Sequence, residues 1–354
     1  MPGPLDVDDL YARVGKALAG FLSAQAPVLD AVGDELGPMM DALSALTSSG
    51  KRLRPAFCYW GWRGAGGDES DAIVTAAASL ELLQAGAIVH DDVMDNSDTR
   101  RGQPAVHRRF MTLHRSAGLR GDPADFGNGA AVLLGDLCLT WADQLLSGSG
   151  LSPQALTAAR PVFDRMRTEL MAGQYLDLLE QARGGGSVSR ARRVIRFKSA
   201  KYTVEGPLHL GAALAGAGPD LLAAYSAYGL PLGEAFQLRD DVLGVFGDPE
   251  CTGKPAGDDL REGKRTVLVA LATERGTPRQ QEALRRHLGD PHLDAAGIIE
   301  LREVLVETGA VTTVEAMIDD ALRRCRDGLL TARVTPRARQ VLGELAIAAT
   351  SRDG

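Results

Sequence analysis

Two groups of aspartates, far apart in the sequence, are the side chains best suited to chemistry. Asp91 and Asp95 are four residues apart and therefore share one face of a helix, with Asp92 adjacent to them. Asp240 and Asp241 form a second pair. Like carboxylates near an apolar core repel one another, and desolvating each costs on the order of several kcal/mol. We therefore expect a cation at each group.

The ligand atoms that these aspartates offer are all carboxylate oxygens. Neither group has a cysteine or a suitably spaced histidine beside it. Such a set suits a hard ion such as Mg²⁺, which binds through few carboxylates and completes its shell with substrate phosphates and water. A single Asp pair is equally typical of an exposed helix end or a cap. Two pairs at the ends of apolar segments favour metal binding.

Basic residues occur in three groups close to the aspartates in the sequence. Any one group alone is typical of a solvated surface. Acidic and basic groups together suggest two polyphosphate sites, one bridged by metal and one held directly by Lys and Arg. The groups are Lys51, Arg52 and Arg54; Arg100 and Arg101; and Lys254, Lys264 and Arg265.

The segments that must position the aspartates are apolar on nearly every face. They cover residues 72–95 and 221–246, and each ends in adjacent carboxylates. A helix that is hydrophobic all round belongs in the middle of a bundle. Pro231 removes one backbone hydrogen bond from the second segment and is expected to kink it.

The rest of the chain also shows helical spacing of apolar residues, without convincing alternation typical of strands. Short connections and the absence of a flexible linker favour antiparallel helices in one domain, residues 1–354. We predict an all-α fold. The expected helices cover residues 8–32, 35–47, 53–63, 71–96, 129–147, 154–182, 190–215, 219–246, 265–274, 278–288, 295–308, 311–331 and 336–350.

Composition restricts the classes of protein and the compartment. The 354 residues are 45% hydrophobic but only 5% aromatic, so the core must consist of small and medium side chains. A net charge of -7 does not describe a nucleic-acid binder. The N-terminus lacks a secretory signal, and no apolar stretch predicts a membrane span. Widely spaced Cys58, Cys138, Cys251 and Cys325 suggest reduced thiols in a cytoplasmic protein.

Five ordered motifs resemble the trans-type isoprenyl diphosphate synthases, also called polyprenyl synthetases. They extend from about residue 45 to about 275, and the sequences are GKRLRP, DDVMDNSDTRRG, KSAKYT, FQLRDDVLGVFGD and GKPAGDDLREGKRT. The resemblance implies a single large helical bundle around a central cavity. It also implies condensation of isopentenyl diphosphate with an allylic diphosphate to give an all-trans polyprenyl diphosphate and pyrophosphate, with homodimers expected.

The resemblance also assigns roles to individual residues. It implies that Asp91, Asp92, Asp95, Asp240 and Asp241 bind Mg²⁺. The expected contacts to the allylic diphosphate are Arg100, Lys198 and Lys254, with Ser199 beside them. The expected contacts to isopentenyl diphosphate are Lys51, Arg54, Gln84 and Arg101. Lys264 is a further active-site lysine, and Gln174 and Gln237 resemble polar residues near the reacting carbons.

The sequence departs from the family pattern at two positions. Gly244 stands where the second motif has a third aspartate, so metal binding there would depend on Asp240 and Asp241. Ser199 replaces a common threonine, which is a mild change because the hydroxyl persists. The lone His90 beside Asp91 is interpreted as structural.

Product length is expected to depend on side chains before the first aspartates. Ala87, Gly86 and Leu83 occupy these positions, and in the resembling family bulky aromatics here stop chain growth early. The small residues therefore favour a twenty-carbon geranylgeranyl product, with farnesyl or longer chains as alternatives. Either Gly86→Phe or Ala87→Phe is expected to shorten the product.

Two other functions compete with the synthase interpretation. A class I terpene cyclase also uses Asp-rich helices and magnesium, but it needs no second diphosphate site such as Lys51, Arg54 and Arg101 would form. A non-catalytic partner subunit would be expected to lose aspartates or lysines, and nearly all are present here.

Overall fold

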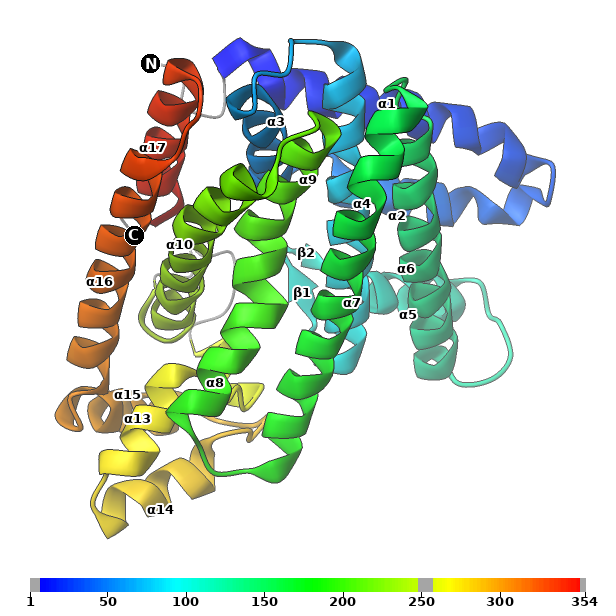
Figure 1. Ribbon diagram of the computed structural model, residues 1–354. Helices are drawn as coiled ribbons and strands as arrows, with labels where there is room; N and C mark the ends of the chain where they lie inside the picture. The colour runs from blue at the N-terminus through cyan, green and yellow to red at the C-terminus, as the bar shows by residue number, and fades with distance from the viewer. Residues whose placement is uncertain (1–6, 248–256, 351–354) are drawn as a thin grey trace. The chain divides into compact units, whose positions relative to one another are not determined.

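The computed structural model describes residues 7–247 and 257–350, which are almost entirely helical (Figure 1). The all-α prediction is confirmed. The chain divides into two compact units. One consists of Met1–Ala159 with Gly211–Gly216, and the other of Arg160–Leu210 with Ala217–Gly354. They are called unit 1 and unit 2 below, and the single domain over residues 1–354 stays a prediction.

Unit 1 contains the N-terminal helices and the only hairpin among the described residues. Its elements are η1 (Val7–Asp9), α1 (Leu10–Asp30), η2 (Asp34–Leu36), α2 (Gly37–Thr47), α3 (Leu53–Gly64), α4 (Asp71–Met94), β1 (Thr99–Arg100), β2 (Gln103–Pro104), α5 (Val106–Ser116) and α6 (Pro123–Ser147).

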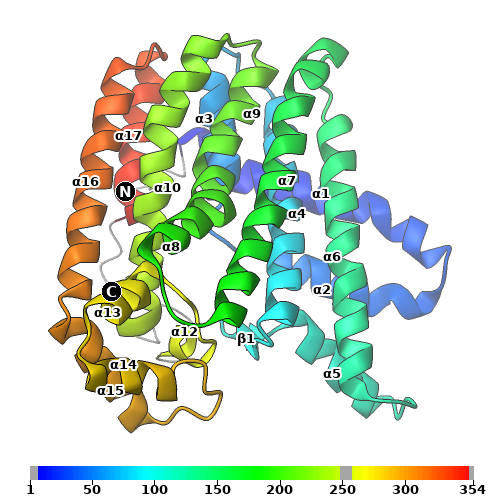
Figure 2. The same cartoon turned by 60° about the horizontal axis from the view of Figure 1, so that its bottom comes forward.

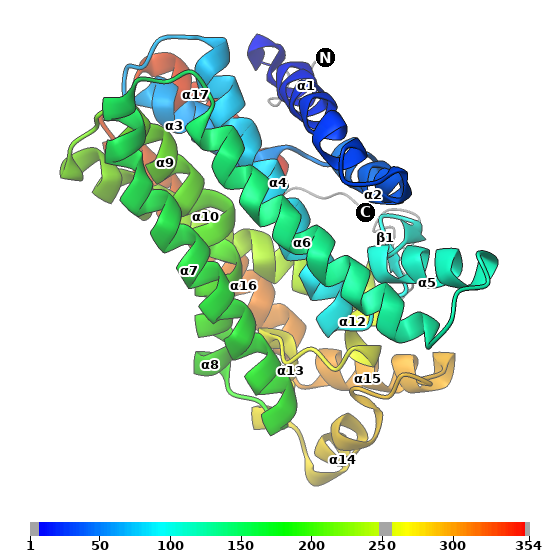
Figure 3. The ribbon, with the colours of Figure 1, turned by 90° about the vertical axis from the view of Figure 1, so that its right-hand side faces the viewer.

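Helix α4 is the core element of unit 1. Ser70 caps its start by accepting a hydrogen bond from the Ile73 amide at 3.4 Å. Its Ala-rich surface packs on α1, α3 and α6, and Figure 3 shows α4 and α6 side by side. Small residues permit this packing, because a Cβ at Gly86 would lie 3.0 Å from the Gly135 carbonyl oxygen of α6. The prediction of a buried helix leading to Asp91 and Asp92 is confirmed.

Two helices of unit 1 are long and apolar enough to cross a bilayer, which the sequence analysis did not expect. They are α4 and α6, with mean hydropathies of 1.7 and 1.2 over their most apolar windows. The α4 window is 72% buried against other parts of the protein and the α6 window 44%. The high hydropathy of α4 is therefore explained by its burial at the centre of unit 1.

A short hairpin follows the first aspartates. Strand β1 pairs antiparallel with β2, with Arg100 opposite Gln103. The two turn residues, Arg101 and Gly102, have φ of 54° and 72°, as a tight two-residue hairpin turn requires. The hairpin thus sends the side chains of Arg100 and Arg101 in different directions.

Helix α5 and the first residues of α6 were missed by the sequence analysis. The sequence VHRRFMTLHRS of α5 is rich in charge, yet Val106, His107, Phe110, Met111 and His114 are buried at helical spacing. Helix α6 begins at Pro123, where Asp122 caps it, rather than near residue 129. Helix α5 was missed because its many charged residues interrupt the apolar pattern. The start of α6 was signalled by a proline in the first turn with an aspartate cap before it.

Unit 2 contains the remaining helices. Its elements are α7 (Pro153–Arg183, which starts in unit 1), α8 (Val188–Val194), the π-helix η3 (Ile195–Glu205), α9 (Gly206–Leu214, which ends in unit 1), α10 (Pro219–Phe246), α12 (Asp258–Arg261), α13 (Val267–Arg275), α14 (Pro278–His287), α15 (Ala295–Glu307), α16 (Ala310–Thr331) and α17 (Pro336–Thr350).

The segment predicted as one helix over 190–215 is in fact α8, η3 and α9 in succession. The π-helix η3 carries Lys198 and Ser199, and π-helical turns are wider than α-helical ones. Glycines on both sides make room for it. A Cβ at Gly173 of α7 would lie 2.5 Å from the Lys198 amide nitrogen, and one at Gly233 of α10 would overlap Ala200.

Helix α10 is the central helix of unit 2. It packs along α16 and η3, and Figure 2 shows α10 and α16 side by side. A Cβ at Gly328 of α16 would lie 2.7 Å from the Ala227 carbonyl oxygen, and the buried Tyr228 hydroxyl donates to the Leu342 carbonyl at 2.7 Å. Helix α10 is uninterrupted from Pro219 to Phe246 and therefore carries the second aspartates to the end of a buried helix.

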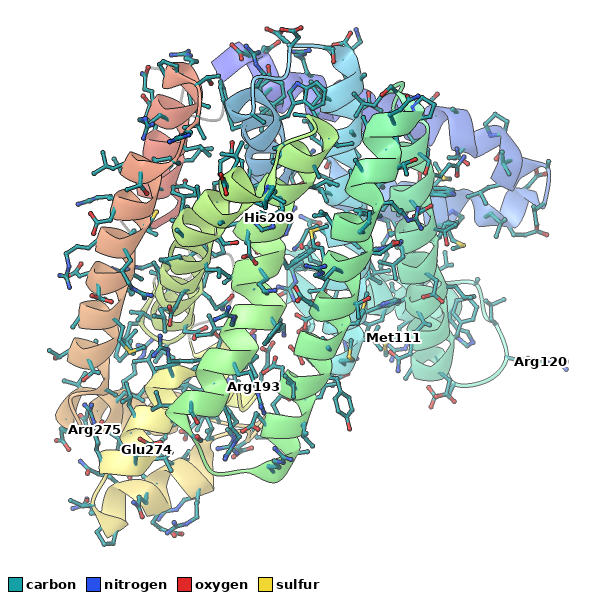
Figure 4. The ribbon with its side chains drawn as sticks, in the orientation of Figure 1. Met111, Arg120, Arg193, His209, Glu274 and Arg275 are labelled. Carbon is teal, nitrogen blue, oxygen red and sulfur yellow. The ribbon has the colours of Figure 1, made fainter. Side chains whose placement is uncertain are left out.

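The other end of unit 2 is tied together by the last turn of α13. Glu274 accepts a hydrogen bond from the Val188 amide at 3.2 Å, at the start of α8. The next residue, Arg275, donates to Thr313 Oγ1 of α16 at 2.8 Å (Figure 4). These contacts connect α8, α13 and α16.

Close helix packing in unit 1 leaves no room for a side chain at Gly211. A Cβ there would overlap the Cys58 carbonyl and lie 2.7 Å from the Trp62 amide nitrogen of α3. We expect Gly211→Ala to lower the free energy of unfolding by roughly 1–3 kcal/mol, as over-packing does. The measurement is thermal or urea unfolding. Gly20→Ala on α1 is the control, since nothing lies within 4 Å of its added methyl. Equal stability of both variants would contradict the packing argument.

Candidate active site

The first aspartates lie at the end of α4 in unit 1. Asp92 is buried, 1% exposed, and Arg100 of β1 compensates its charge. Arg100 Nε donates to Asp92 Oδ1 at 2.9 Å, and its Nη2 bonds the same oxygen while lying 3.8 Å from Asp91 Oδ2. Asp95 is the C-terminal cap residue of the helix. The structure thus brings Arg100, Asp91 and Asp92 together.

A group of cations lies beside these aspartates in unit 1. Arg101 Nη1 donates to the Ser49 carbonyl at 2.8 Å and lies 3.1 Å from the position of a Cβ at Gly50, whose φ of 128° requires glycine. Burial lowers the pKa of Arg101, and the charges of Arg100, Arg52 and Arg54 lower it further. Residues 49–54 and Arg101, distant in sequence, therefore share one basic region.

The remaining predicted residues of α4 face in different directions. The buried Gln84 Oε1 has no hydrogen-bond partner within residues 7–247 and 257–350, so it is available to a ligand. Leu83 is fully buried, and Ala87 is partly exposed. Gly86 was expected to influence product length, but a side chain at this position would point at α6, 3.2 Å from Cys138 Cβ. The side of α4 at Gly86 is closely packed, and the influence of Gly86 on product length stays a prediction.

His90 also points toward α6. Its Nε2 lies 3.1 Å from the Val132 carbonyl oxygen and 3.6 Å from Asp136 Oδ1. These contacts support the structural interpretation, because the ring is engaged by α6 although Asp91 is its neighbour in sequence.

The second aspartates lie near the end of α10 in unit 2. Asp241 is buried, and Gln237 Nε2 donates to its Oδ1 at 2.8 Å. Burial raises the pKa of Asp241 to about 8, and the hydrogen bond from Gln237 only partly opposes this. The charges of Asp259 and Asp240 raise it further, while Lys264 lowers it. A carboxyl in these surroundings binds a proton or a cation more readily than an ordinary aspartate.

Asp259 lies within the motif GKPAGDDLREGKRT but was not predicted as a site residue. A Cβ at Gly244 would overlap the Asp259 carboxylate, so this carboxylate fills the space that a side chain at 244 would need. Lys264 Nζ donates to Asp259 Oδ1 at 2.9 Å and lies 2.6 Å from Glu262 Oε2. The sequence signal was the glycine at the third motif position together with the acidic segment after Gly257.

Lys198 lies on η3 in unit 2, as do Ser199 and the neighbouring tyrosine and threonine. Its Nζ donates to Asp177 Oδ2 of α7 at 2.7 Å, and Ser199 is buried. Asp177 was not predicted, although it lies three residues after Gln174 on the same helix. Lys254 lies outside the described residues.

The donors available for a metal ion are carboxylates at two helix ends. In the part of the chain that the structure describes, no three Asp, Glu, His or Cys side chains are placed to hold a metal ion by themselves. Few protein carboxylates are what Mg²⁺ uses when phosphates and water complete its shell. Asp92 of unit 1 and Asp241 of unit 2 each provide a buried carboxylate that fits such an ion.

Comparison with known proteins agrees with this chemistry. A family model described as polyprenyl synthetase matches residues 38–304. Geranylfarnesyl diphosphate synthase of Aeropyrum pernix is 31% identical over 293 residues, which cover 81% of this chain and 85% of the relative. Octaprenyl diphosphate synthase of Escherichia coli is 34% identical over 258 residues, 71% of this chain and 73% of the relative.

A solved structure is similar along nearly the whole chain. It is the crystal structure of geranylgeranyl pyrophosphate synthase from Corynebacterium glutamicum, complexed with isoprenyl diphosphate and magnesium. The TM-score is 0.95 at 41% sequence identity, covering 98% of this chain and 100% of that chain. The family match, the aligned relatives and the paired carboxylates and cations agree, so this chain belongs to the polyprenyl synthetase family and is a trans-prenyl diphosphate synthase.

Proposed function

We propose that this synthase is magnesium-dependent and forms mainly geranylgeranyl diphosphate from isopentenyl diphosphate and allylic diphosphates. The observation that carries the metal proposal is a buried carboxylate at the end of each central helix, Asp92 on α4 and Asp241 on α10. Each lies beside further acidic groups, so a divalent ion bridging to a diphosphate would offset the crowded negative charge.

Each of the two groups of aspartates, one in unit 1 and one in unit 2, would hold metal. These are Asp91, Asp92, Asp95, Asp240 and Asp241. When bound, Mg²⁺ supplies electrostatic stabilisation of the charge that develops on a departing diphosphate. Arg100, which contacts Asp92 and Asp91, and Gln237, which donates to Asp241, keep these side chains oriented.

The cationic side chains bind and orient the two diphosphates. Lys51, Arg54 and Arg101 of unit 1 take the diphosphate of isopentenyl diphosphate, with Gln84 beside them. Lys198, held on η3 by Asp177, binds oxygens of the allylic diphosphate, as does Arg100. Charge-assisted hydrogen bonds from Lys and Arg suit both tasks because phosphate oxygens are strong acceptors.

The reaction then follows from the chemistry of the substrates. The allylic carbon–oxygen bond breaks and the pyrophosphate leaves with the electron pair. The double bond of isopentenyl diphosphate attacks the allylic cation, and a proton is then lost to re-form a double bond. We expect apolar side chains around the bound substrates to exclude water from the cation. The departing pyrophosphate is the base that we propose for the proton, because no side-chain base is evident.

Product length is proposed from the small side chain at Ala87. This residue lies one turn before Asp91 on α4 and remains partly exposed. A methyl group there leaves room for a growing chain. Relatives of this family are named for products of different length, so farnesyl and longer products are the alternatives.

We further propose a cytoplasmic homodimer. Exposed apolar side chains support a protein partner, among them Leu133 of α6 and Tyr175 of α7, 63% and 65% exposed. Cys58, Cys138 and Cys325 are free thiols and buried, which suits a reducing compartment. Light scattering on a sizing column tests the assembly, and a monomer at micromolar concentration would contradict it.

Removing one carboxylate from either group is expected to abolish turnover. Asp92→Asn and Asp240→Asn keep the side-chain shape but remove a charge that the metal proposal requires. We expect pyrophosphate release to fall by roughly 100-fold or more, as for other groups that stabilise developing charge. Circular dichroism verifies folding, and EDTA should inhibit the wild type equally. Turnover at the wild-type rate in a folded variant would refute the proposal.

The raised pKa of Asp241 predicts a pH-dependent stability. The usual value is 3.8 and the folded value about 8, so ionisation opposes folding. Relative to Asp241→Asn, the metal-free wild type should lose stability as pH rises from about 4 to about 8 and change no further above that. Melting temperatures in EDTA at several pH values measure this. A stability difference between Asp241→Asn and wild type that stays the same from pH 4 to pH 8 would contradict the burial argument.

A bulky residue at Ala87 is expected to shorten the product. Ala87→Phe should shift the products toward farnesyl diphosphate while the first condensation stays within about threefold of wild type, as a pocket-volume change allows. Chromatography of radiolabelled products measures the distribution. Gly86→Phe serves as a contrast, because its ring would collide with α6 and lower the melting temperature instead. An unchanged distribution for Ala87→Phe would disprove this role.

A further inference from the structure

A buried ion pair joins Arg52 of the basic region of unit 1 to Glu81 of α4, and the proposed reaction does not use it. Arg52 Nη1 donates to Glu81 Oε2, and Arg52 Nη2 donates to the Thr47 carbonyl. The two side chains are only 3% and 9% exposed. A buried pair of this kind contributes little net stability, although breaking it is costly. The ion pair therefore matters less for stability than for the residues that it positions.

The backbone at Arg52 is in an unusual conformation. Its φ of 51° places it in the left-handed region, which is unfavourable for a residue with a Cβ. Residues held this way persist only where surrounding contacts determine them, and they gather at functional sites. Here the ion pair to Glu81 supplies those contacts. Lys51 precedes this residue and Arg54 follows it on the first turn of α3, so the Arg52 conformation sets how both are presented.

Glu81 also acts on the second part of the basic region. Arg101 has a left-handed φ of 54° and contacts the Ser49 carbonyl. Its pKa is lowered by burial and by three neighbouring arginines, whereas Glu81 raises it. Arg100 has its own counter-charge in Asp92. The negative charge of Glu81 therefore offsets part of the repulsion between Arg52 and Arg101.

We propose that Glu81 is a positioning residue for isopentenyl diphosphate. Its carboxylate fixes Arg52 and balances part of the charge, so Lys51, Arg54 and Arg101 stay together with a net positive charge toward the diphosphate. The inference rests on the proposed assignment of these three cations to isopentenyl diphosphate. Glu81 lies three residues before Gln84 on α4 and thus on neighbouring positions of one helix face.

Removing the Glu81 carboxylate changes diphosphate binding in opposite directions under the two possible roles, positioning of the cations and a simple charge effect. If Glu81 acted only as a nearby negative charge, its removal would make the region more positive and tighten diphosphate binding. If it positions the cations, its removal weakens binding although the charge becomes more favourable.

Glu81→Gln is the first test variant. We expect its KM for isopentenyl diphosphate to rise roughly tenfold or more, since charge-assisted hydrogen bonds become misaligned. The KM for the allylic diphosphate and kcat at saturation should stay within about threefold of wild type, as for lost uniform binding. Glu81→Asp should recover part of the KM. An unchanged or lower KM for isopentenyl diphosphate would overturn the proposal.

A second variant covers the case in which Glu81→Gln does not fold. The double variant Arg52→Met with Glu81→Met removes both charges, so no buried charge is left alone. We expect it to fold and to show the same selective rise in KM for isopentenyl diphosphate. A folded double variant with a wild-type KM would overturn the proposal as well.

Two controls separate this inference from its premises. Glu180→Gln in unit 2 removes a buried carboxylate that pairs with Arg183 and Arg190, so it should lower the melting temperature without a selective change in KM. Arg101→Ala tests the site assignment. If Arg101→Ala leaves the KM for isopentenyl diphosphate unchanged, the assignment fails. If it raises this KM and the Glu81 variants do not, only the positioning role fails.

Discussion

Charge compensation at the ends of buried helices is the interaction on which this enzyme depends. Central helices of a bundle must be apolar, yet α4 and α10 both bring carboxylates to their ends. Each buried carboxylate has a contact that makes it tolerable, Asp92 from Arg100 and Asp241 from Gln237. The same groups are the ones we propose to bind metal and diphosphate, so the proposed chemistry and the stability of these helix ends have one physical origin.

The sequence was sufficient to predict the helices whose apolar residues recur at regular spacing along one segment. Periodic apolar residues predicted α4 and α10, and the structure confirms both together with the all-α class. The apolar pattern was obscured where charged residues interrupt it, as in α5, whose Arg109 and Arg115 are exposed while Phe110 and Met111 are buried. It also could not foresee η3, because a π-helix is favoured by its neighbours Gly173 and Gly233 rather than by its own residues.

Partners across long sequence distances could not be predicted from spacing. The acidic and basic motifs were found because they repeat a pattern, but neither Glu81 in an apolar segment nor Asp177 on α7 belongs to such a pattern, and Asp259 is only one member of an acidic segment. Only the fold brings Glu81 to Arg52, 29 residues away, and Asp177 to Lys198, 21 residues away. Gly86 illustrates the converse, since its place beside Ala87 suggested a shared role, whereas the two face different sides of α4.

The π-helix has a consequence for natural variation in this chain. A π-helix accommodates an additional residue within an otherwise α-helical run, so loss of one residue there would let the segment relax to an ordinary α-helix. Because the wide turn absorbs the additional residue locally, that relaxation would keep the register of the following helix α9 and change only the segment that carries Lys198 and Ser199. A one-residue deletion within residues 195–205 should accordingly displace these two side chains while the later helices keep their places, so such deletions should be rarer among descendants of this sequence than deletions in the glycine-rich turn at 184–186.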